Sequence, residues 1–195
     1  MALERALELF WTQGYEATSL ADLTRAMEIA PPSLYAAFGN KEQLFLEAVA
    51  RYVERYGGFT ERALAEEPTA RGAIERILHE AAAEYTVPGR PPGCFVFSGA
   101  TNCSAAAAEV EEALRRMRRA SEAVIRRRLE RAAAEGELPP GADAASLAGF
   151  VATVMEGMSQ QARDGAGRAH LQAIAGAAMA AWPAPRTRRA RPPRR

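Results

Sequence analysis

The stretch TSLADLTRAMEIAPPSLYAAFGNKEQLF, residues 18–45, joins two short apolar-patterned segments through a double proline and then breaks at a Gly-Asn pair. Ser19 and Asp22 have the spacing of a capping box, which favours a helix starting at residue 20. Pro31 and Pro32 suit the first turn of a further helix, where a missing amide proton costs nothing. That further helix is too short to be stable alone in water. We therefore expect its neighbours to hold it and to present it to another molecule.

The rest of the chain is also patterned for helices, because its apolar residues recur with a helical period. Residues 94–103, CFVFSGATNC, could form a strand by propensity, but no second strand is available to pair with them. The sequence therefore predicts an all-α protein. The expected helices cover residues 3–13, 19–27, 31–38, 40–53, 70–85, 94–103, 109–135, 143–163 and 167–182.

The composition is that of a globular protein, with 48% hydrophobic and 25% charged residues among 195. No apolar run approaches the roughly 20 residues that cross a bilayer, and the first residues lack the pattern of a secretory signal. Two cysteines are too few for a disulfide scaffold. We expect a cytoplasmic protein without a membrane partner.

Charge is unevenly distributed along the chain. Residues 186–195 contain six arginines and no acid, so residues 1–185 carry 19 basic and 24 acidic side chains, a net charge of −5. We expect this Arg/Pro-rich tail, residues 185–195, to be disordered. The arginine runs at residues 115–119 and 126–128 lie at helical offsets from glutamates, which favours a salt-bridged solvent face over a second nucleic-acid site.

Two helices joined by a turn of three to four residues, and braced by a preceding helix, make a helix-turn-helix. In this arrangement Leu34 and Phe38 would point into the three-helix core, while Tyr35 could donate its hydroxyl to a phosphate. Lys41 falls in the first turn of the next helix, beside free amide protons and the positive end of the helix dipole, where it could bind a phosphate.

These residues carry a resemblance to a known family. The pattern F-x-x-x-G-Y, then T-S-L-x-D-L, then S-L-Y-x-x-F-x-x-K-E-x-L, resembles the DNA-binding domain of the tetracycline-repressor (TetR/AcrR) family of bacterial regulators. The resemblance implies a helix-turn-helix DNA-binding domain at residues 1–45. It implies a ligand-binding and dimerisation domain, also helical, at residues 46–184. The DNA-contacting set is expected to be Thr18, Ser19, Pro31, Pro32, Ser33, Tyr35, Ala36 and Lys41.

Two positions depart from the family pattern. Glu28 stands where the family usually turns on glycine, and Ala30 stands where a serine commonly caps the recognition helix. Residues 1–56 carry five cations and eight acids, a net charge of −3, which is poor for counterion-release affinity. DNA binding would then depend on a few cations, on dimerisation or on the arginine tail.

Other functions have little support. There is no Gly-rich phosphate loop, nucleophile elbow or HExxH motif, so we expect no enzyme and no cofactor. Cys94 and Cys103 fit no common metal spacing and are interpreted as buried apolar cysteines, with a thiol sensor as the alternative. His79 and His170 are isolated, so no metal site is expected. A helical adaptor protein without specific DNA binding remains the alternative function.

The resemblance to this family implies a repressor that leaves its operator DNA when a small molecule binds to the protein. We expect a neutral, apolar or amphipathic effector, because the candidate pocket contains no charged side chain. The candidate pocket residues are Phe95, Phe97, Met117, Phe150, Met155 and Met158.

A single short recognition helix reads few base pairs, so we expect a homodimer on palindromic double-stranded DNA. The two final helices are rich in small and apolar residues, and pairing them with their symmetry mates would give a four-helix bundle. The expected interface residues are Leu147, Val151, Val154, Leu171, Ile174, Ala178 and Ala181.

Overall fold

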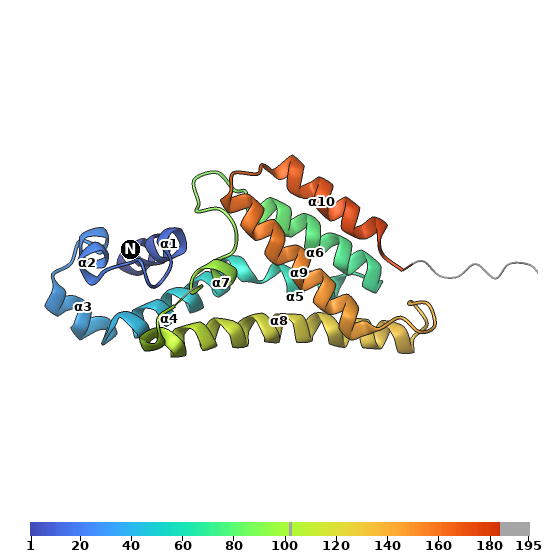
Figure 1. The fold of residues 1–195 in the computed structure, drawn as a ribbon, viewed down its shortest axis with the longest axis horizontal. Coiled ribbons are helices and arrows are strands. Elements are labelled where there is room, and N and C mark those ends of the chain that lie inside the picture. The colour runs from blue at the N-terminus through green and yellow to red at the C-terminus, as the bar shows by residue number, and fades with distance from the viewer. Residues whose placement is uncertain (102, 184–195) are drawn as a thin grey trace, which may run out of the picture.

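A computed structural model describes residues 1–101 and 103–183. These residues form helices joined by turns and contain no strand, which confirms the all-α prediction (Figure 1). The expected disorder of residues 185–195 concerns a segment outside the described residues. None of the described helices is long and apolar enough to span a bilayer.

Four helices gather at the N-terminal end of the molecule (Figure 1). They are α1 (Ala2–Gln13), α2 (Leu20–Met27), α3 (Pro31–Phe38) and α4 (Lys41–Tyr52). Their core is apolar and closed to solvent: Phe10, Leu23, Leu34 and Phe45 are all 0% exposed. The ring of Phe10 meets that of Phe45 edge-on with 5.0 Å between centroids. The short helix α3 is thus anchored through Leu34, as expected for a helix that cannot stand alone.

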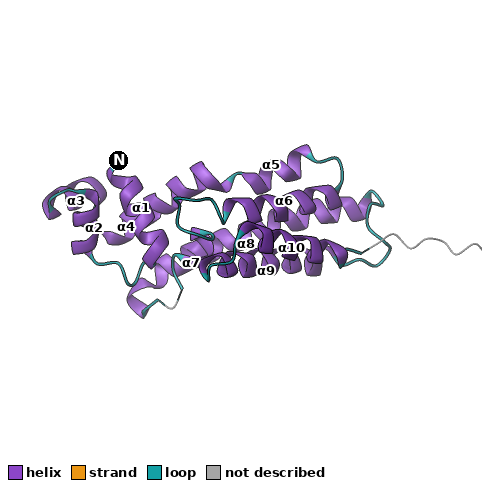
Figure 2. Cartoon of the chain, turned by 90° about the horizontal axis from the view of Figure 1, so that it is seen from above, coloured by secondary structure: helices purple, strands orange, loops and turns teal. Residues whose placement is uncertain are grey.

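The remainder of the chain forms a second, longer bundle. It begins with a π-helical turn (Val53–Gly57) and contains α5 (Phe59–Glu66), α6 (Ala70–Glu84) and α7 (Phe95–Ser98). A 3-10 turn (Ala105–Ala107) then leads into α8 (Ala108–Ala134), which is followed by α9 (Ala144–Arg163) and α10 (Arg168–Ala180). Helix α8 contacts both α4 and α9, and Figure 2 shows α5 with α6 on one side of the body and α9 with α10 on the other.

Two segments differ from the sequence-based expectation. Residues 57–69 had no assignment and contain α5, whose buried residues include Phe59 and Leu64. The helix expected over residues 94–103 is correct only for α7, because the chain turns at Gly99. There the Gly99 carbonyl accepts a hydrogen bond from the backbone amide of Tyr15, at 2.7 Å, instead of continuing a helix.

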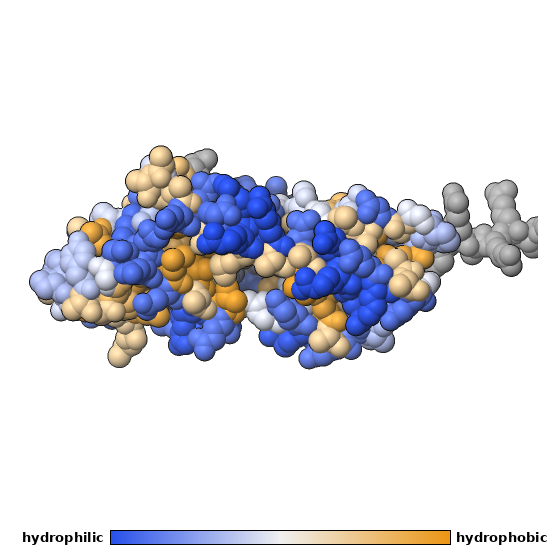
Figure 3. All heavy atoms as spheres, turned by 90° about the horizontal axis from the view of Figure 1, so that it is seen from below, coloured by the Kyte–Doolittle hydropathy of each residue, from blue (hydrophilic) through white to orange (hydrophobic). Residues whose placement is uncertain are grey.

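Exposed residues of α8 are mostly charged, and the view from below shows hydrophilic areas interspersed with apolar ones (Figure 3). Arg115 pairs with Glu111 at 2.5 Å and with Glu112 at 2.8 Å, and Arg126 pairs with Glu130 at 3.3 Å. These pairs confirm a salt-bridged face for Arg115, Arg116 and Arg126, whereas Arg118 donates to the Val96 carbonyl and the buried Arg128 pairs with Glu137.

Candidate functional site

The N-terminal half of α3 is exposed on the side away from its anchor. Pro31 and Pro32 occupy the first helical positions, and they are exposed together with Ser33 and Ala36. The Tyr35 side chain is 50% exposed, whereas Leu34 beside it is fully buried. Helix α3 therefore offers small side chains and one phenol to a partner, which suits close contact with the edges of a DNA groove.

The turn between α2 and α3 contains a strained residue. Glu28 has φ +56° and ψ +43°, the left-handed conformation that glycine adopts more readily. Its carboxylate Oε1 lies 2.7 Å from Nη1 of Arg5 on α1, and the same guanidinium nitrogen donates to the carbonyl of Ala26. This ion pair offsets part of the backbone strain. It also neutralises the charge of Arg5 near the α2–α3 turn. Ala30 starts α3 without a side-chain cap, as the sequence indicated.

The start of α2 holds two of the expected DNA contacts, and they differ. Ser19 is exposed and forms the expected capping box: its hydroxyl accepts from the Asp22 amide at 3.1 Å, and Asp22 Oδ2 accepts from the Ser19 amide at 3.3 Å. The hydrogen bond from the Ser19 hydroxyl lowers the pKa of Asp22. Thr18 is 0% exposed and donates its hydroxyl to the Gly14 carbonyl at 2.6 Å. The expectation that its side chain contacts DNA is wrong, because that side chain fixes the loop before α2.

Lys41 is held at the start of α4 by an aromatic ring. Its Nζ lies 4.2 Å from the centroid of the Tyr15 ring, a cation–π contact. Tyr15 in turn packs edge-on against Phe45, with 5.1 Å between centroids. Partial burial lowers the pKa of Lys41, against the opposing effect of Glu16. The contact places the ammonium beside the first turn of α4, where it can meet a phosphate.

The arginines of this end are already engaged with carboxylates. Arg5 pairs with Glu28, Arg25 pairs with Asp22 at 3.4 Å, and both Arg51 and Arg55 pair with Glu4. Lys41 is the one cation of residues 1–56 that forms no ion pair with the described residues. It is therefore the cation that is most available to a DNA backbone.

A cavity of about 250 Å³ lies in the body of the molecule, between α4, α5, α7, α8 and α9. Phe97, Met117 and Met155 line it, as the sequence predicted. The other three predicted residues do not: Phe95 and Met158 are buried elsewhere in the core, and Phe150 is 40% exposed on α9. The error arose because the hydrophobic pattern identifies apolar residues without distinguishing a cavity wall from a packed core.

The cavity also has polar walls that the sequence did not indicate. Tyr52, Tyr85, Cys94 and Arg118 all line it. Burial raises the pKa of both phenols well above the ordinary value, and it raises the pKa of the Cys94 thiol. All three groups are therefore protonated near neutral pH and can donate hydrogen bonds. They come from three separate helices or helix ends, so no local pattern could have grouped them.

The cavity is connected to the DNA-binding end through α7. Arg118 on α8 donates to the carbonyl of Val96 in α7 at 2.9 Å. Arg163 at the end of α9 donates to the Trp11 carbonyl at 3.1 Å and to the Ser98 hydroxyl at 3.3 Å. Together with the hydrogen bond between Tyr15 and Gly99, these contacts tie α7 to the end of α1.

The two final helices place the expected dimer residues on two different faces. Val151, Leu171 and Ala178 are at most 7% exposed inside the chain's own core, so they cannot form a subunit interface. Leu147, Val154 and Ile174 are half-buried, and Ala181 is exposed. The fully outward face of α10 is instead a row of small residues: Ala169, Ala173, Gly176, Ala177 and Ala180. The helical period alone could not tell the outer stripe from the inner one, since both are apolar.

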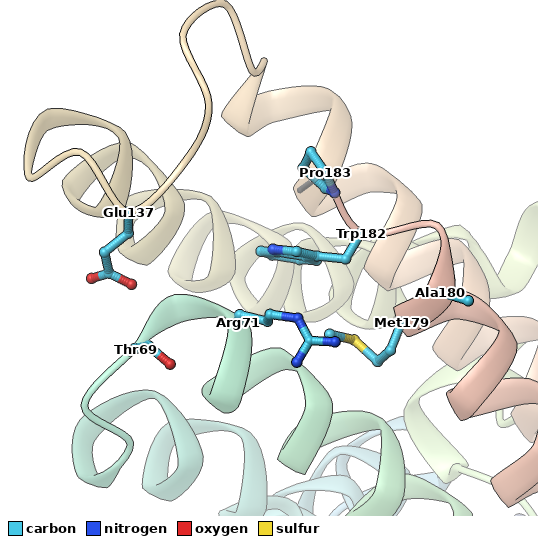
Figure 4. Close-up of a pocket in the computed structure, with 7 residues that line it drawn as sticks. All are labelled: Thr69, Arg71, Glu137, Met179, Ala180, Trp182 and Pro183. Carbon is cyan, nitrogen blue, oxygen red and sulfur yellow. The ribbon is translucent and has the colours of Figure 1, made fainter. Parts of the chain in front are cut away.

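A second hollow, of about 530 Å³, lies where the end of α10 faces the start of α6 (Figure 4). The ring of Trp182 lies over Arg71 and Met179, with Glu137 and Thr69 at the far end. Its charged groups are satisfied within the chain: Glu137 accepts from the Ala70 amide at 2.5 Å, and Arg71 pairs with Glu75 at 3.1 Å. We therefore assign no ligand to it.

The helix-turn-helix with its exposed α3, joined to a helical body that holds a cavity, defines a DNA-binding transcriptional regulator. Residues 2–48 match the bacterial regulatory proteins of the tetR family, and residues 73–177 match the tetracyclin repressor-like C-terminal domain. The chain belongs to the TetR family, which confirms the resemblance.

Similar proteins support this membership. The HTH-type transcriptional repressor ComR of Escherichia coli is 37% identical over 183 residues, which cover 93% of this chain and 87% of that protein. The repressor BdcR of the same organism is 31% identical over 84% of this chain and 78% of its own. A cysteine-substituted variant of the regulator CifR, solved with a 26-base-pair operator duplex, has 43% identity and a TM-score of 0.89. This similarity covers 93% of this chain and 95% of that chain.

Proposed function

We propose that the protein is a cytoplasmic transcriptional repressor that binds operator DNA as a homodimer and leaves it when a small molecule enters the cavity. The observation that carries this proposal is the exposed start of α3, with Tyr35 half-exposed, together with Lys41 held on the Tyr15 ring at the start of α4. The names of ComR and BdcR as repressors, and the operator duplex bound to CifR, support the same assignment.

Within this proposal each predicted region has a role. Residues 1–45 would carry the DNA contacts, through Ser19, Tyr35, Lys41 and the small residues at the start of α3. Residues 46–184 would carry the effector cavity and the dimer contact. The proposed boundary at residue 45 falls inside α4, which contacts α1 at one end and α7 and α8 at the other. Helix α4 would therefore transmit movement between the two regions.

The dimer contact is proposed on the outward faces of α9 and α10. Small residues on α10 let two helices approach closely, and Phe150 supplies an exposed aromatic group on α9. Pairing both helices with those of a second copy would form a four-helix bundle and set two copies of α3 on one face of a DNA duplex.

The decisive experiment is a salt-resolved binding assay with the full-length protein. Duplexes from the DNA upstream of its own reading frame are compared with random duplexes of equal length. We expect a clear preference for one upstream duplex at about 100 mM salt, because base contacts survive salt better than phosphate attraction does. Equal binding to all duplexes would overturn the operator assignment and favour the alternative of a helical adaptor protein.

A further inference from the structure

Arg118 is a cationic side chain in the wall of a mainly apolar cavity. It lies on α8, is half-buried, and also lines a neighbouring, smaller hollow of about 150 Å³. Glu61 lines the cavity, and Glu122 and Glu156 line the smaller hollow. None of these carboxylates, nor any other among the described residues, lies within the 4.0 Å of an ion pair with Arg118. A partly buried cation without a counter-charge favours the binding of an anion.

The neighbouring polar groups favour the same type of ligand. Tyr52, Tyr85 and Cys94 bring O–H and S–H groups to the same cavity wall as the Arg118 guanidinium. A carboxylate accepts hydrogen bonds only, so it complements a wall of donors better than a neutral hydroxyl or amide does.

The size and lining of the cavity limit the remainder of the ligand. A volume of about 250 Å³ corresponds to about eight water molecules in the liquid. Phe59, Val96, Phe97, Met117 and Val124 provide apolar walls around it. A short hydrocarbon or aromatic group with one anionic end fits both the volume and the lining.

The present partner of Arg118 links the cavity to the DNA-binding end. Its guanidinium holds the Val96 carbonyl at 2.9 Å, and Val96 belongs to α7. Helix α7 ends at Gly99, and the Gly99 carbonyl accepts a hydrogen bond from the amide of Tyr15. The ring of Tyr15 supports Lys41. Loss of the bond between Arg118 and Val96 would therefore loosen the segment that positions the Lys41 ammonium.

We propose that Arg118 recognises the effector, which is a small apolar molecule with a carboxylate or similar anionic end. The anionic end binds the guanidinium, which then no longer donates to the Val96 carbonyl. This proposal rests on the ligand-controlled repressor proposed above. It replaces the expectation of a neutral effector, which came from a residue set that lacked Arg118. The release of α7 is the step that lowers the affinity for DNA.

Matched probes test the charge requirement without knowledge of the natural effector. Hexanoate and hexanamide have the same hydrocarbon chain and differ in the charge of one end. Binding to the full-length protein is measured by calorimetry and, in a Trp182→Phe background, by the fluorescence of Trp11, whose ring lies 4.8 Å from that of Tyr52 in the cavity wall. We expect wild type to bind hexanoate at least about tenfold more tightly than hexanamide. Equal binding, a preference for hexanamide, or no saturable binding of either at millimolar concentration would overturn the proposal.

Variants then assign the preference to one residue. Arg118→Gln should bring the affinity ratio close to one, and Arg118→Lys should keep part of it. Arg127→Gln, an exposed arginine on the same helix, should leave it unchanged. A preference that survives in Arg118→Gln would place the anion elsewhere. Should Arg118→Gln fail to fold, the comparison of the two probes on wild type and on Arg118→Lys still decides.

Release from DNA is measured separately. Hexanoate should weaken the binding of wild type to its preferred upstream duplex, and hexanamide should have less effect. If no duplex is preferred, the repressor assignment fails while the probe measurements still test Arg118. If a duplex is preferred but hexanoate binds without releasing it, the mechanism through α7 is wrong.

Discussion

Lys41 and Tyr35 lie at the same end of the molecule but are held differently. Tyr35 stands free on α3, whereas Lys41 rests on the ring of Tyr15 and is half-buried. The family motif contains all three residues, so sequence could select them. It could not show that Tyr15 supports Lys41, because that contact joins residues 26 positions apart (15 and 41) through the fold.

The first prediction concerns these two side chains. Lys41→Ala should weaken operator binding and reduce the salt slope by about one unit for each lysine removed, because one phosphate contact is lost. Tyr35→Phe should weaken binding with an unchanged slope, since a neutral hydroxyl releases no counterion. Binding is measured by fluorescence anisotropy at several salt concentrations, with circular dichroism to confirm folding. Unchanged affinity in both variants would remove these residues from the DNA contact set.

The second prediction concerns Glu28. Glu28→Gly should raise the free energy of unfolding by about 1 kcal/mol, because relief of the left-handed conformation outweighs the loss of an exposed ion pair with Arg5. It should also tighten DNA binding, since Arg5 becomes free to approach a phosphate. Glu28→Gln is the matched control, which removes the charge and keeps the strain. A decrease in stability of Glu28→Gly in denaturant titration would show that the ion pair matters more than the backbone.

At the scale of the elements, sequence predicted the long helices well and the short connecting helix poorly. Capping residues and apolar periodicity locate α2, α4, α6, α8, α9 and α10 because these signals are local. Helix α7 ends after four residues because the carbonyl of Gly99 bonds to Tyr15, a partner supplied by a distant helix. The polar wall of the cavity was not predicted for the same reason, since its members come from the ends of α4 and α6, the start of α7 and the middle of α8.

The third prediction concerns the contact between α9 and α1. Arg163 donates to the carbonyls of Trp11 and Thr12 in the last turn of α1, and so satisfies groups that lack a helical partner. Arg163→Gln should lower the free energy of unfolding by about 1–2 kcal/mol. It should weaken operator binding as well, because the DNA-binding end is less firmly held to α9.

The control for Arg163 is Arg168→Gln. Arg168 donates to the carbonyl of Ala83 at 3.3 Å, near the end of α6, and so makes a similar bond that does not reach the DNA-binding end. This control should leave the affinity for DNA unchanged. If both variants weaken binding equally, the effect reflects general stability and Arg163 has no coupling role.

At the scale of the whole molecule, the contact that a single chain does not show is the proposed interface between two copies. The apolar stripe selected from sequence turned out to be mixed, because helices α9 and α10 are apolar on the inner face and rich in small residues on the outer one. Only the packed chain shows that Leu171 and Ala178 face inward.

The fourth prediction tests the outer face as the dimer contact. Ala173→Arg or Ala177→Arg should give folded monomers that no longer bind the operator, because each places an unpaired charge in the proposed bundle. Light scattering measures the mass, and circular dichroism confirms folding. Ala134→Arg, on the exposed end of α8, should remain dimeric. Intact dimers in both α10 variants would place the interface on another surface.

The ion pairs of the DNA-binding end have a physiological consequence. With the arginines of residues 1–56 all neutralised, the described part of a dimer brings two lysines to the phosphates, and the salt exponent should be about −2. A repressor with many phosphate contacts loses most of its affinity for DNA when the salt concentration rises. With so shallow an exponent, the described DNA-binding end would keep most of its affinity when the salt concentration rises, and its release would depend on the chemical signal.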